Sequence, residues 1–493
     1  MKKRLLLFFG LILLYILPLA FVSTQIFLGT FPFWYDNARD LLQASSKLTL
    51  IGPTTGVPGI FYGPYWIWLL SIALTVSQDP RVVDFMVATI PYFIFLPLIL
   101  LKLKKVFSPV ALLIGWTLFI TGFSRYTMQL WNPYPAPLLF AALVMIITFT
   151  DFKKATKKTY LQILLAGFMA GLVANFHLSF GTGVLTGSCL FFTLQIIFHR
   201  SLWKRYILYT VIFIAGIISA FAPFFLFELK HGFNQIQTII TVITSREVLV
   251  GQTGLTNPQI LNELAQTAGK LFGVSGIVAI IVSIGLFTSL LFILKQQSKS
   301  FTDPEKRFIG FVGTIFITLF SIYLTARYPA WSYHFIGTEM ILTFFIIFIA
   351  HRSILLRRVL MVVAGISLVF YLSNTAISIQ KIIKDPHIIT SMATEQYIIT
   401  WIAQDANRQD YDVYAYSPAI YSYEYDYLFN WMLKRPLHMS DTTSKKIVYL
   451  IIPNTTDDIR KDFINYKTPN ADYQTTKVYS LPDKTTILKR EKP

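Results

Sequence analysis

Residues 5–27 read LLLFFGLILLYILPLAFVSTQIF, an apolar run without a single charged side chain. A transmembrane helix needs about 17–25 mostly apolar residues, so this run is long enough to cross a bilayer. Lys2, Lys3 and Arg4 precede it, as they would in a signal peptide. The apolar region of a signal peptide is only about 7–15 residues long, however, and no clean cleavage site of small residues follows. We therefore expect a first membrane helix that is retained.

Further apolar runs follow along most of the chain. Hydrophobic residues make up 54% of the sequence and charged residues only 14%, and the mean hydropathy is +0.56. Soluble globular chains carry about 25% charged residues, so this composition excludes a secreted soluble enzyme and a disordered tail protein. The sequence predicts a polytopic α-helical membrane protein. Its candidate spans are 5–27, 60–77, 82–101, 108–124, 133–150, 160–178, 181–198, 206–227, 271–294, 308–326, 333–350 and 355–373.

The basic residues indicate which side of the membrane each loop occupies. The net charge is +18, and nearly all of the excess lies between apolar runs in 1–373. Short basic loops between spans mark the cytoplasmic side, so we expect no nucleic-acid partner from this charge. The single cysteine, Cys189, excludes an internal disulfide and a cysteine-based metal site. The basic clusters, all expected in the cytoplasm, are 2–4, 102–105, 153–158, 200–205, 295–307 and 352–358.

This assignment constrains the number of crossings. The N-terminus and the 102–105 loop are both expected in the cytoplasm, but three apolar runs lie between them. We expect 60–77, which is rich in aromatic residues, to be a juxtamembrane or re-entrant element on the outer face. About eleven crossings then remain, and the C-terminus is expected on the outer side of the cell membrane. The alternative is twelve crossings with one basic loop exposed outside.

From residue 374 onward the composition changes, and no run is long enough to span a membrane. Strand-like and helix-like pieces alternate there, which favours a small α/β domain. We therefore predict a transmembrane domain over 1–373 and an extracytoplasmic α/β domain over 374–493. The expected strands lie at 412–416, 447–452 and 485–488, and the expected helices at 392–405 and 457–465.

The first outer segment contains the clearest candidate residues for chemistry. Asp36 and Asp40 are four residues apart with Arg39 between them, so a short helix places all three side chains on neighbouring positions. A carboxylate here could act as a general base or hold a metal ion, and Arg39 could bind a phosphate. The alternative is a surface helix whose aspartates only stabilise its N-terminus.

Other polar residues are predicted at the same outer face. Arg125 follows an apolar run and could bind an anionic lipid head, although arginines at membrane boundaries often only reach the headgroups. Glu339 lies inside a predicted span and needs a partner such as Arg327 or His334. For each further candidate a purely structural role remains the alternative. These substrate-pocket candidates are Asp40, Tyr62, Asn132, His177, Glu228, His231 and His334.

Known motifs for nucleotide or metal chemistry are absent from the sequence. The seven histidines form no H-x-x-H or H-E-x-x-H pattern, and there is no G-x-x-x-x-G-K-[ST] run or G-x-S-x-G elbow. We therefore expect no cofactor and no reaction driven by nucleotide hydrolysis. The need for a divalent metal stays open.

Several of these stretches resemble those of a known enzyme group. The chain is similar in layout to the GT-C superfamily of membrane glycosyltransferases, and more closely to glycosyltransferase family 39. That family includes protein O-mannosyltransferases and lipid A aminoarabinose transferases. The resemblance covers most of 1–373 in layout, but the shared motifs are short. They are YDNARDLL (35–42), IGPTTGVPGIFYGPYW (51–66), SRYTMQLWNP (124–133) and PFFLFELKHGF (223–233).

The resemblance implies an activity and roles for particular residues. Such enzymes transfer a sugar from a polyprenyl phosphate in the outer leaflet to an acceptor, by a single inverting displacement. It implies that Asp36 is the general base and that Arg39 and Arg125 hold the donor phosphate. Many relatives carry Asp-Glu at the first motif, whereas this chain has Asp36-Asn37, which puts a metal site in doubt.

The partners expected from this resemblance are the polyprenyl-phosphate sugar, the lipid bilayer and an acceptor that could be a protein, a lipid or a glycan. Two other functions remain as alternatives. One is a transporter or flippase, which would need ionisable residues along a path through the membrane. The first eight apolar runs carry almost none away from their ends. The other is a polymerase or ligase of lipid-linked surface glycans, which differs only in its acceptor.

Overall fold

The computed structural model describes the chain except for residues 1–9, 11, 47, 56–58, 245–254, 326–330, 386, 388, 418–420 and 436–444. Contacts divide the chain into two compact units. The first unit comprises Met1–Leu19, Thr49–Leu69 and Val87–Leu372, and the second comprises Ala20–Leu48, Leu70–Met86 and Ser373–Pro493. The second unit thus contains two short N-terminal segments besides the C-terminal region, and a domain boundary at residue 373 stays a prediction.

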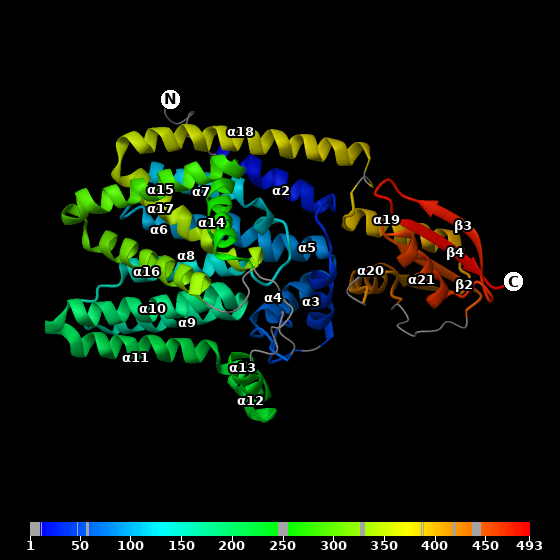
Figure 1. Ribbon diagram of the computed structural model, residues 1–493, viewed down its shortest axis with the longest axis horizontal. Helices are drawn as coiled ribbons and strands as arrows, with labels where there is room; N and C mark the ends of the chain where they lie inside the picture. Colours follow the sequence, from blue (N-terminus) through cyan, green and yellow to red (C-terminus); the bar gives the residue numbers. More distant parts are fainter. Residues whose placement is uncertain are drawn as a thin grey trace. The chain divides into compact units, whose positions relative to one another are not determined.

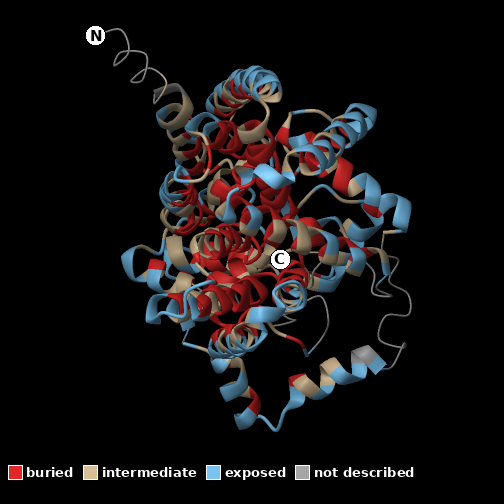
Figure 2. Ribbon diagram, turned by 90° about the vertical axis from the view of Figure 1, so that its left-hand side faces the viewer, coloured by how far each residue is buried: buried red, intermediate tan, exposed pale blue. Residues whose placement is uncertain are grey.

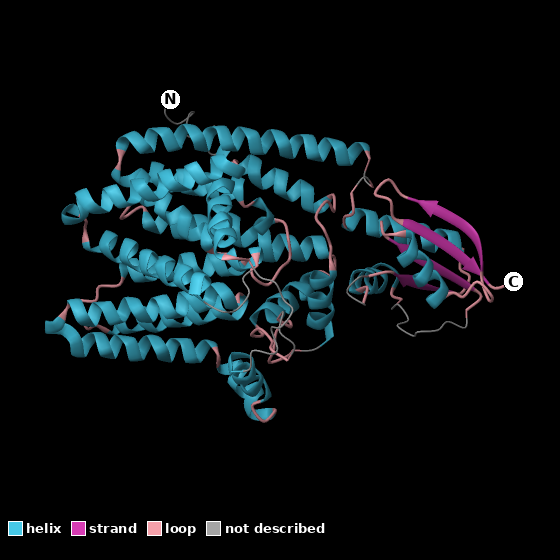
Figure 3. Cartoon of the chain, in the orientation of Figure 1, coloured by secondary structure: helices cyan, strands magenta, loops and turns pink. Residues whose placement is uncertain are grey.

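The described elements are mostly helical, and strands occur only in the C-terminal region (Figure 3). Up to residue 220 they are η1 (Ile12–Ile16), α2 (Leu17–Phe27), α3 (Tyr35–Ser46), α4 (Tyr65–Val76), α5 (Pro80–Asp84), η2 (Phe85–Thr89), η3 (Pro91–Phe95), α6 (Leu96–Leu103), α7 (Pro109–Gly122), η4 (Ser124–Thr127), α8 (Pro135–Phe149), α9 (Lys157–Phe176), α10 (Leu178–Phe198), η5 (Arg200–Leu202) and α11 (Trp203–Ala220). Then follow α12 (Ala222–Lys230), α13 (Asn234–Thr244), α14 (Asn257–Leu271), α15 (Gly276–Gln297), η7 (Ser298–Ser300), α16 (Asp303–Thr325), η8 (Ser332–Phe335), α17 (Thr338–Arg352) and α18 (Ile354–Lys384). The C-terminal region contains α19 (Met392–Ala406), β1 (Tyr411–Ala415), α20 (Tyr423–Leu433), β2 (Ile447–Ile452), α21 (Asp457–Lys467), β3 (Gln474–Ser480) and β4 (Thr486–Glu491).

The prediction of a polytopic membrane protein is confirmed. Within the described residues, 8 helices are long and apolar enough to cross a membrane, and four shorter apolar helices accompany them. Each predicted span overlaps at least one of the observed helices. Helix α4, in the run predicted not to cross, has 12 residues and is therefore about 18 Å long, shorter than the hydrocarbon core of about 30 Å.

The helices of the first unit pack closely where glycines replace larger side chains. Helix α9 lies against α8 and α11, and α10 lies against α16 (Figure 1). A Cβ atom on Gly167 of α9 would lie 2.0 Å from the Phe213 carbonyl oxygen of α11, and one on Gly216 would lie 2.2 Å from the Leu164 carbonyl oxygen. Small residues therefore allow the two backbones to touch, as in other membrane helix pairs. Buried residues gather on the inward faces of the helices (Figure 2).

The basic loops of the first unit meet at one end of its helices. Lys153 forms an ion pair with Asp303 at 2.7 Å, and the Arg205 guanidinium donates to the Lys153 carbonyl oxygen at 2.5 Å. Arg352 pairs with Glu305, which lies two residues after Asp303 in the first turn of α16. These contacts join the loops around 153, 205, 303 and 352, as expected if all of them face the same side of the membrane. Helices α8 and α17 run between this basic end and the opposite end of the unit.

In the second unit, a four-stranded sheet forms the core of the C-terminal region. The strand order is β1-β2-β4-β3, with β1 and β2 parallel and the other pairs antiparallel. Strand β2 reads IVYLII and is buried along its whole length, which suits a central strand. Tyr414, Val448, Leu450 and Leu488 pack together as its hydrophobic core.

This sheet confirms the predicted small α/β region and adds to it. The predicted strands correspond to β1, β2 and β4, and the predicted helices to α19 and α21. The prediction did not include β3, α20 or the amphipathic helix α14 of the first unit. Of these three, α14 matters most for function because it contributes side chains to a cavity.

Candidate active site

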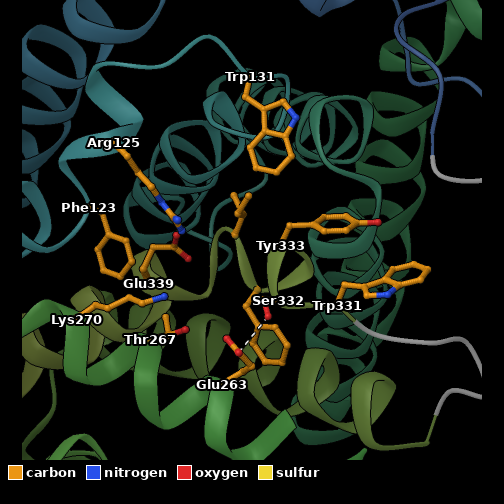
Figure 4. A pocket seen from close by; sticks show the side chains of 12 residues that line it. Phe123, Arg125, Trp131, Glu263, Thr267, Lys270, Trp331, Ser332, Tyr333 and Glu339 are labelled. Carbon is orange, nitrogen blue, oxygen red and sulfur yellow. Dashed lines mark hydrogen bonds between the residues drawn. The ribbon is translucent and has the colours of Figure 1, made fainter. Parts of the chain in front are cut away.

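A cavity of about 680 Å³ opens in the first unit, at the end of α7 that lies away from the basic loops. Four elements surround it: η4, which follows α7, then α14, η8 and the start of α17 (Figure 4). Two residues that the sequence singled out, Arg125 and Glu339, line it, and of the predicted site residues Arg125 is the one among its described lining residues. The described lining residues are Phe123, Arg125, Trp131, Glu263, Thr267, Lys270, Trp331, Ser332, Tyr333, Phe335, Ile336 and Glu339.

Two positively charged side chains lie on the same side of this cavity. Gly122, at the end of α7, packs so closely on α14 that a Cβ atom would lie 2.6 Å from the Lys270 carbonyl oxygen. This close approach brings Lys270 near Arg125, three residues beyond Gly122 (Figure 4). Within the described part of the chain, neither side chain donates a hydrogen bond or forms an ion pair with a protein oxygen; the Arg125 guanidinium lies 5.5 Å from the Tyr126 ring centroid.

The charge of Lys270 responds to these surroundings. Partial burial lowers the pKa of its ammonium group below the ordinary value, and the positive charge of Arg125 lowers it further, while Glu263 acts in the opposite direction. An anion bound between Lys270 and Arg125 would relieve this repulsion and form charge-assisted hydrogen bonds. The pair is therefore suited to bind a phosphate group.

Two carboxylates, Glu263 and Glu339, also line the cavity. The Ser332 hydroxyl donates to Glu263 Oε1 at 3.0 Å, which joins η8 to α14. The backbone N–H of Gly337 donates to Glu339 Oε2 at 2.7 Å. Figure 4 shows the Arg125 side chain directed toward Glu339, so Arg125 supplies the positive charge that the sequence led us to expect from His334 or Arg327. Arg327 lies outside the described residues.

Aromatic rings form another wall of the cavity and connect it with a second one. Trp331 and Tyr333 stack with ring centroids 5.9 Å apart and planes inclined by 10°, and Trp131 lies 6.2 Å from Tyr333. Trp131 also lines a neighbouring cavity of about 190 Å³, whose other walls are largely apolar and include Trp66 and Tyr92. A ligand with a charged head and an apolar tail matches this pair of cavities.

The aspartate motif forms helix α3 of the second unit, as predicted. Arg39 contacts both acidic side chains: its Nη1 lies 2.9 Å from Asp36 Oδ1, and its Nη2 lies 2.7 Å from Asp40 Oδ1. Burial opposes the charge of Arg39, but Asp40 and then Asp36 outweigh it and raise the pKa of Arg39 above its ordinary value. Asp40 is buried, whereas the Asp36 side chain keeps 34% of its surface exposed. The base role of Asp36 and the phosphate role of Arg39 stay predictions.

Three other predicted residues lie where helices and loops join. The Asn132 amide donates to the Phe176 carbonyl oxygen at 3.0 Å. His177 lies buried at the junction of α9 and α10, and His334 Nδ1 accepts from the backbone N–H of Trp331 at 3.2 Å. His334 thereby fixes the turn η8, whose Ser332, Tyr333 and Phe335 line the cavity.

The remaining predicted residues lie on other parts of the first unit. Glu228 is buried, and its Oε2 accepts from the backbone N–H of Ile236 at 3.0 Å near the start of α13. His231 is exposed and stacks on Phe227. Tyr62 pairs through its backbone with Gly52 and Pro53. Substrate roles for these residues stay predictions, and none of them is among the described residues lining the large cavity.

The described residues include no group of three or more His, Cys, Asp or Glu side chains placed to hold a metal ion.

Sequence reasoning missed the three cavity residues of α14: Glu263, Thr267 and Lys270. This helix was not predicted as a membrane span, because its apolar residues lie on one face and do not form a continuous run. A signal was nevertheless present. The Thr256 backbone N–H donates to the Gln259 side chain at 2.8 Å, a capping contact that such a Thr-x-x-Gln sequence favours. Apolar residues then recur at helical spacing: Ile260, Leu264, Ala268 and Leu271.

Comparison with solved structures shows which fold this is. A crystal structure of ArnT from Cupriavidus metallidurans bound to undecaprenyl phosphate matches with a TM-score of 0.63 at 9% identity, over 99% of this chain and 98% of that chain. The chain has the ArnT fold. The apo structure of ArnT matches similarly, with a TM-score of 0.60 at 8% identity, over 99% and 97% of the two chains.

The ArnT likeness confirms the GT-C-like fold that the sequence resemblance implied. ArnT is a lipid A aminoarabinose transferase and a GT-C glycosyltransferase. No protein-family model matches the chain. No curated protein matches it in sequence.

Proposed function

We propose that the protein transfers a sugar from a polyprenyl-phosphate donor to an acceptor at the outer face of the membrane. The observation that carries this proposal is the pair of Arg125 and Lys270, two cations that form no ion pair within the described residues, in a cavity of about 680 Å³. The undecaprenyl phosphate bound to the similarly folded ArnT supports a polyprenyl phosphate as the ligand.

The cavity has the chemical features that a lipid-phosphate leaving group requires. As the bond between the sugar and the phosphate breaks, negative charge develops on the phosphate oxygens, and fixed cations stabilise it. Arg125 can bind two phosphate oxygens with its planar guanidinium, and Lys270 contributes a point charge. The small apolar cavity that shares Trp131 would hold the first part of the prenyl chain.

We further propose that Asp36 is the general base of an inverting displacement. The acceptor hydroxyl gives its proton to the Asp36 carboxylate while its oxygen forms a bond with the anomeric carbon. The bond between this carbon and the phosphate oxygen breaks, and the polyprenyl phosphate leaves with its electron pair. The exposed edge of Asp36 and its contact with Arg39, which fixes the carboxylate, are compatible with this role.

The expected site faces the outside because the cavity lies at the end of the helices opposite the basic loops. With these loops in the cytoplasm, the cavity opens toward the outer leaflet. Glu263, Ser332 and the aromatic pair Trp331–Tyr333 then remain to contact the sugar. Aromatic faces and carboxylates suit the apolar and hydroxyl surfaces of a sugar ring.

A transfer assay with purified protein in lipid nanodiscs tests this function. A panel of polyprenyl-phosphate sugars is supplied, and released polyprenyl phosphate is measured. We expect Arg125→Ala and Lys270→Ala each to lower kcat/KM about 10- to 100-fold, because a hydrogen bond to a charged group contributes about 1.5–3 kcal/mol. Lys299→Ala, at an exposed lysine of the basic end, is the matched control and should keep wild-type activity.

Binding of undecaprenyl phosphate, measured in the same nanodiscs, separates substrate capture from chemistry. The double variant of Arg125 and Lys270 should lose binding as well as turnover. If it binds and turns over like the wild type, these residues do not form the phosphate site. Movement of intact lipid-linked sugar across vesicles, without cleavage of its sugar–phosphate bond, would instead indicate a flippase.

A further inference from the structure

A second large cavity of the first unit shares no lining residue with the candidate active site. It is a groove of about 600 Å³ lined by residues of η1, η3, α6 and α7. Helix α7 begins at this groove with Pro109 and ends beside the active-site cavity with Gly122. The groove is lined by the first half of α7, from Pro109 to Trp116, whereas the active-site cavity begins beyond its last residue, so the two cavities lie along different parts of this helix.

The walls of the groove are apolar and their polar groups are already bonded. Among the described residues that line it, Lys104 is the one charged side chain. The Tyr15 hydroxyl donates to the Phe93 carbonyl oxygen, and the Trp116 indole N–H donates to the Leu14 carbonyl oxygen at 3.4 Å. The body of the groove therefore offers nothing for a polar ligand to bind.

One end of the groove is strongly basic. Lys104 lines this end, Lys102 and Lys105 are its near neighbours in the sequence, and all three side chains are exposed. Within the described residues, none of them forms an ion pair or donates a hydrogen bond; Lys102 lies 5.9 Å from the Phe149 ring centroid. Of these three lysines, Lys104 lines the groove, and its ammonium group has no anionic partner among the residues that the structure describes.

We propose that this groove binds an anionic phospholipid of the cytoplasmic leaflet. An acyl chain lies along the apolar walls, and the phosphate of the headgroup contacts Lys104. Basic pockets between membrane helices on the cytoplasmic side are known to hold anionic headgroups, and the 102–105 cluster is expected on that side. The separation along α7 distinguishes this lipid from the donor, whose phosphate is expected at the other end of that helix.

Charge complementarity determines which lipid the groove prefers. In a bilayer, an apolar groove gains little from exchanging one acyl chain for another, so the walls alone do not select among phospholipids. The selectivity must come from Lys104 and its neighbours, and it favours an anionic headgroup over a zwitterionic one. The interaction is independent of the transferase activity.

Intact-protein mass spectrometry of the full-length chain in detergent tests this site. The protein is titrated with phosphatidylglycerol and with phosphatidylcholine of the same acyl chains. We expect one tightly retained phosphatidylglycerol and at least fivefold weaker retention of phosphatidylcholine. Lys104→Glu should weaken phosphatidylglycerol binding about tenfold, whereas Lys158→Glu, at another exposed basic loop, should leave it unchanged.

A second variant tests the groove itself without a change of charge. Leu98 lines the groove and is 55% exposed, so Leu98→Trp fills part of it without entering the core. This variant should weaken retention of both lipids, and Leu161→Trp, at a 65% exposed leucine of α9, should not. Unchanged unfolding midpoints of the variants show that they fold.

Three outcomes would overturn the proposal. Equal retention of the two phospholipids would remove the selectivity on which it rests. Equal effects of Lys104→Glu and Lys158→Glu would show that the binding depends on general surface charge and not on this groove. Displacement of phosphatidylglycerol by undecaprenyl phosphate, at equal concentration and in a manner that depends on Lys104, would assign the groove to the polyprenyl lipid instead.

Discussion

Asp36 and Asp40 share one arginine, but they differ in exposure, so the proposed catalytic role of Asp36 can be tested apart from the structural contact of Asp40. The Asp36 side chain is 34% exposed, whereas that of Asp40 is 2% exposed and accepts two hydrogen bonds from Arg39. A half-exposed ion pair contributes only about 0.2–1 kcal/mol to stability. Removal of one charge from a buried pair costs about 3–5 kcal/mol, and at Asp40 this loss is reduced to the extent that Arg39 keeps its contact with Asp36.

We expect Asp36→Asn to lower kcat by about 10²–10⁴-fold, the usual contribution of a general base, with little change in the unfolding midpoint. Asp40→Asn should lower the unfolding midpoint strongly. Turnover and thermal unfolding of the two purified variants, measured side by side, check both effects. Near-normal transfer by Asp36→Asn would show that another group takes the proton.

At the scale of structural elements, Gly52 and Gly63 are packed in close contact: Gly52 against the backbone of Gly63, and Gly63 against the side chain of Asn175. A Cβ atom on Gly52 would lie 2.2 Å from the Gly63 carbonyl oxygen, and one on Gly63 would lie 1.6 Å from Asn175 Oδ1. Asn175 cannot easily move, because its amide donates to the carbonyl oxygens of Gly171 and Ala220 at 2.8 and 3.3 Å. Gly52 and Gly63, each followed by a proline, therefore have no room for a larger side chain.

Gly63→Ala should therefore lower the unfolding midpoint and the transfer rate. Gly285→Ala in α15, where nothing lies within 4 Å of the new Cβ, should be neutral or slightly stabilising and serves as the control. Combined with Asn175→Ala, Gly63→Ala should add little further destabilisation, since the overlapping atoms are gone. Strictly additive losses in the double variant would falsify this steric explanation, because independent sites add and contacting sites do not.

The elements that the sequence predicted well are those with strong local patterns. Long apolar runs predicted the membrane helices, and the continuous run Ile447–Ile452 predicted the central strand β2. Helix α14 and the edge strand β3 were missed because neither has an uninterrupted apolar run, and β3 is exposed along most of its length. The cavity residues were predicted to a similar extent. Arg125 was predicted from the sequence. Lys270 was not, because its position beside the cavity depends on the close packing of Gly122 on α14, which no sequence pattern indicates.

At the scale of the whole molecule, the charges predict how the chain is inserted. Contacts such as those of Lys153 with Asp303 and Arg352 with Glu305 gather the basic loops at one end of the first unit. Helix α18 begins among these loops and has 31 residues, so it is about 46 Å long and exceeds the hydrocarbon core of about 30 Å. If the basic end is cytoplasmic, α18 crosses the membrane and the region after residue 384 lies outside.

Labelling of engineered cysteines measures this orientation directly, because Cys189 is the one native cysteine and Cys189→Ala gives a background without thiols. In intact cells, a membrane-impermeant maleimide should label Lys461→Cys on α21. It should label Lys104→Cys and Lys154→Cys only after the membrane is opened, because the positive-inside rule places both loops in the cytoplasm. Labelling of Lys104→Cys from outside, with Lys154→Cys still protected, would instead indicate twelve crossings with one basic loop exposed. It would also rule out a cytoplasmic-leaflet lipid in the groove beside Lys104.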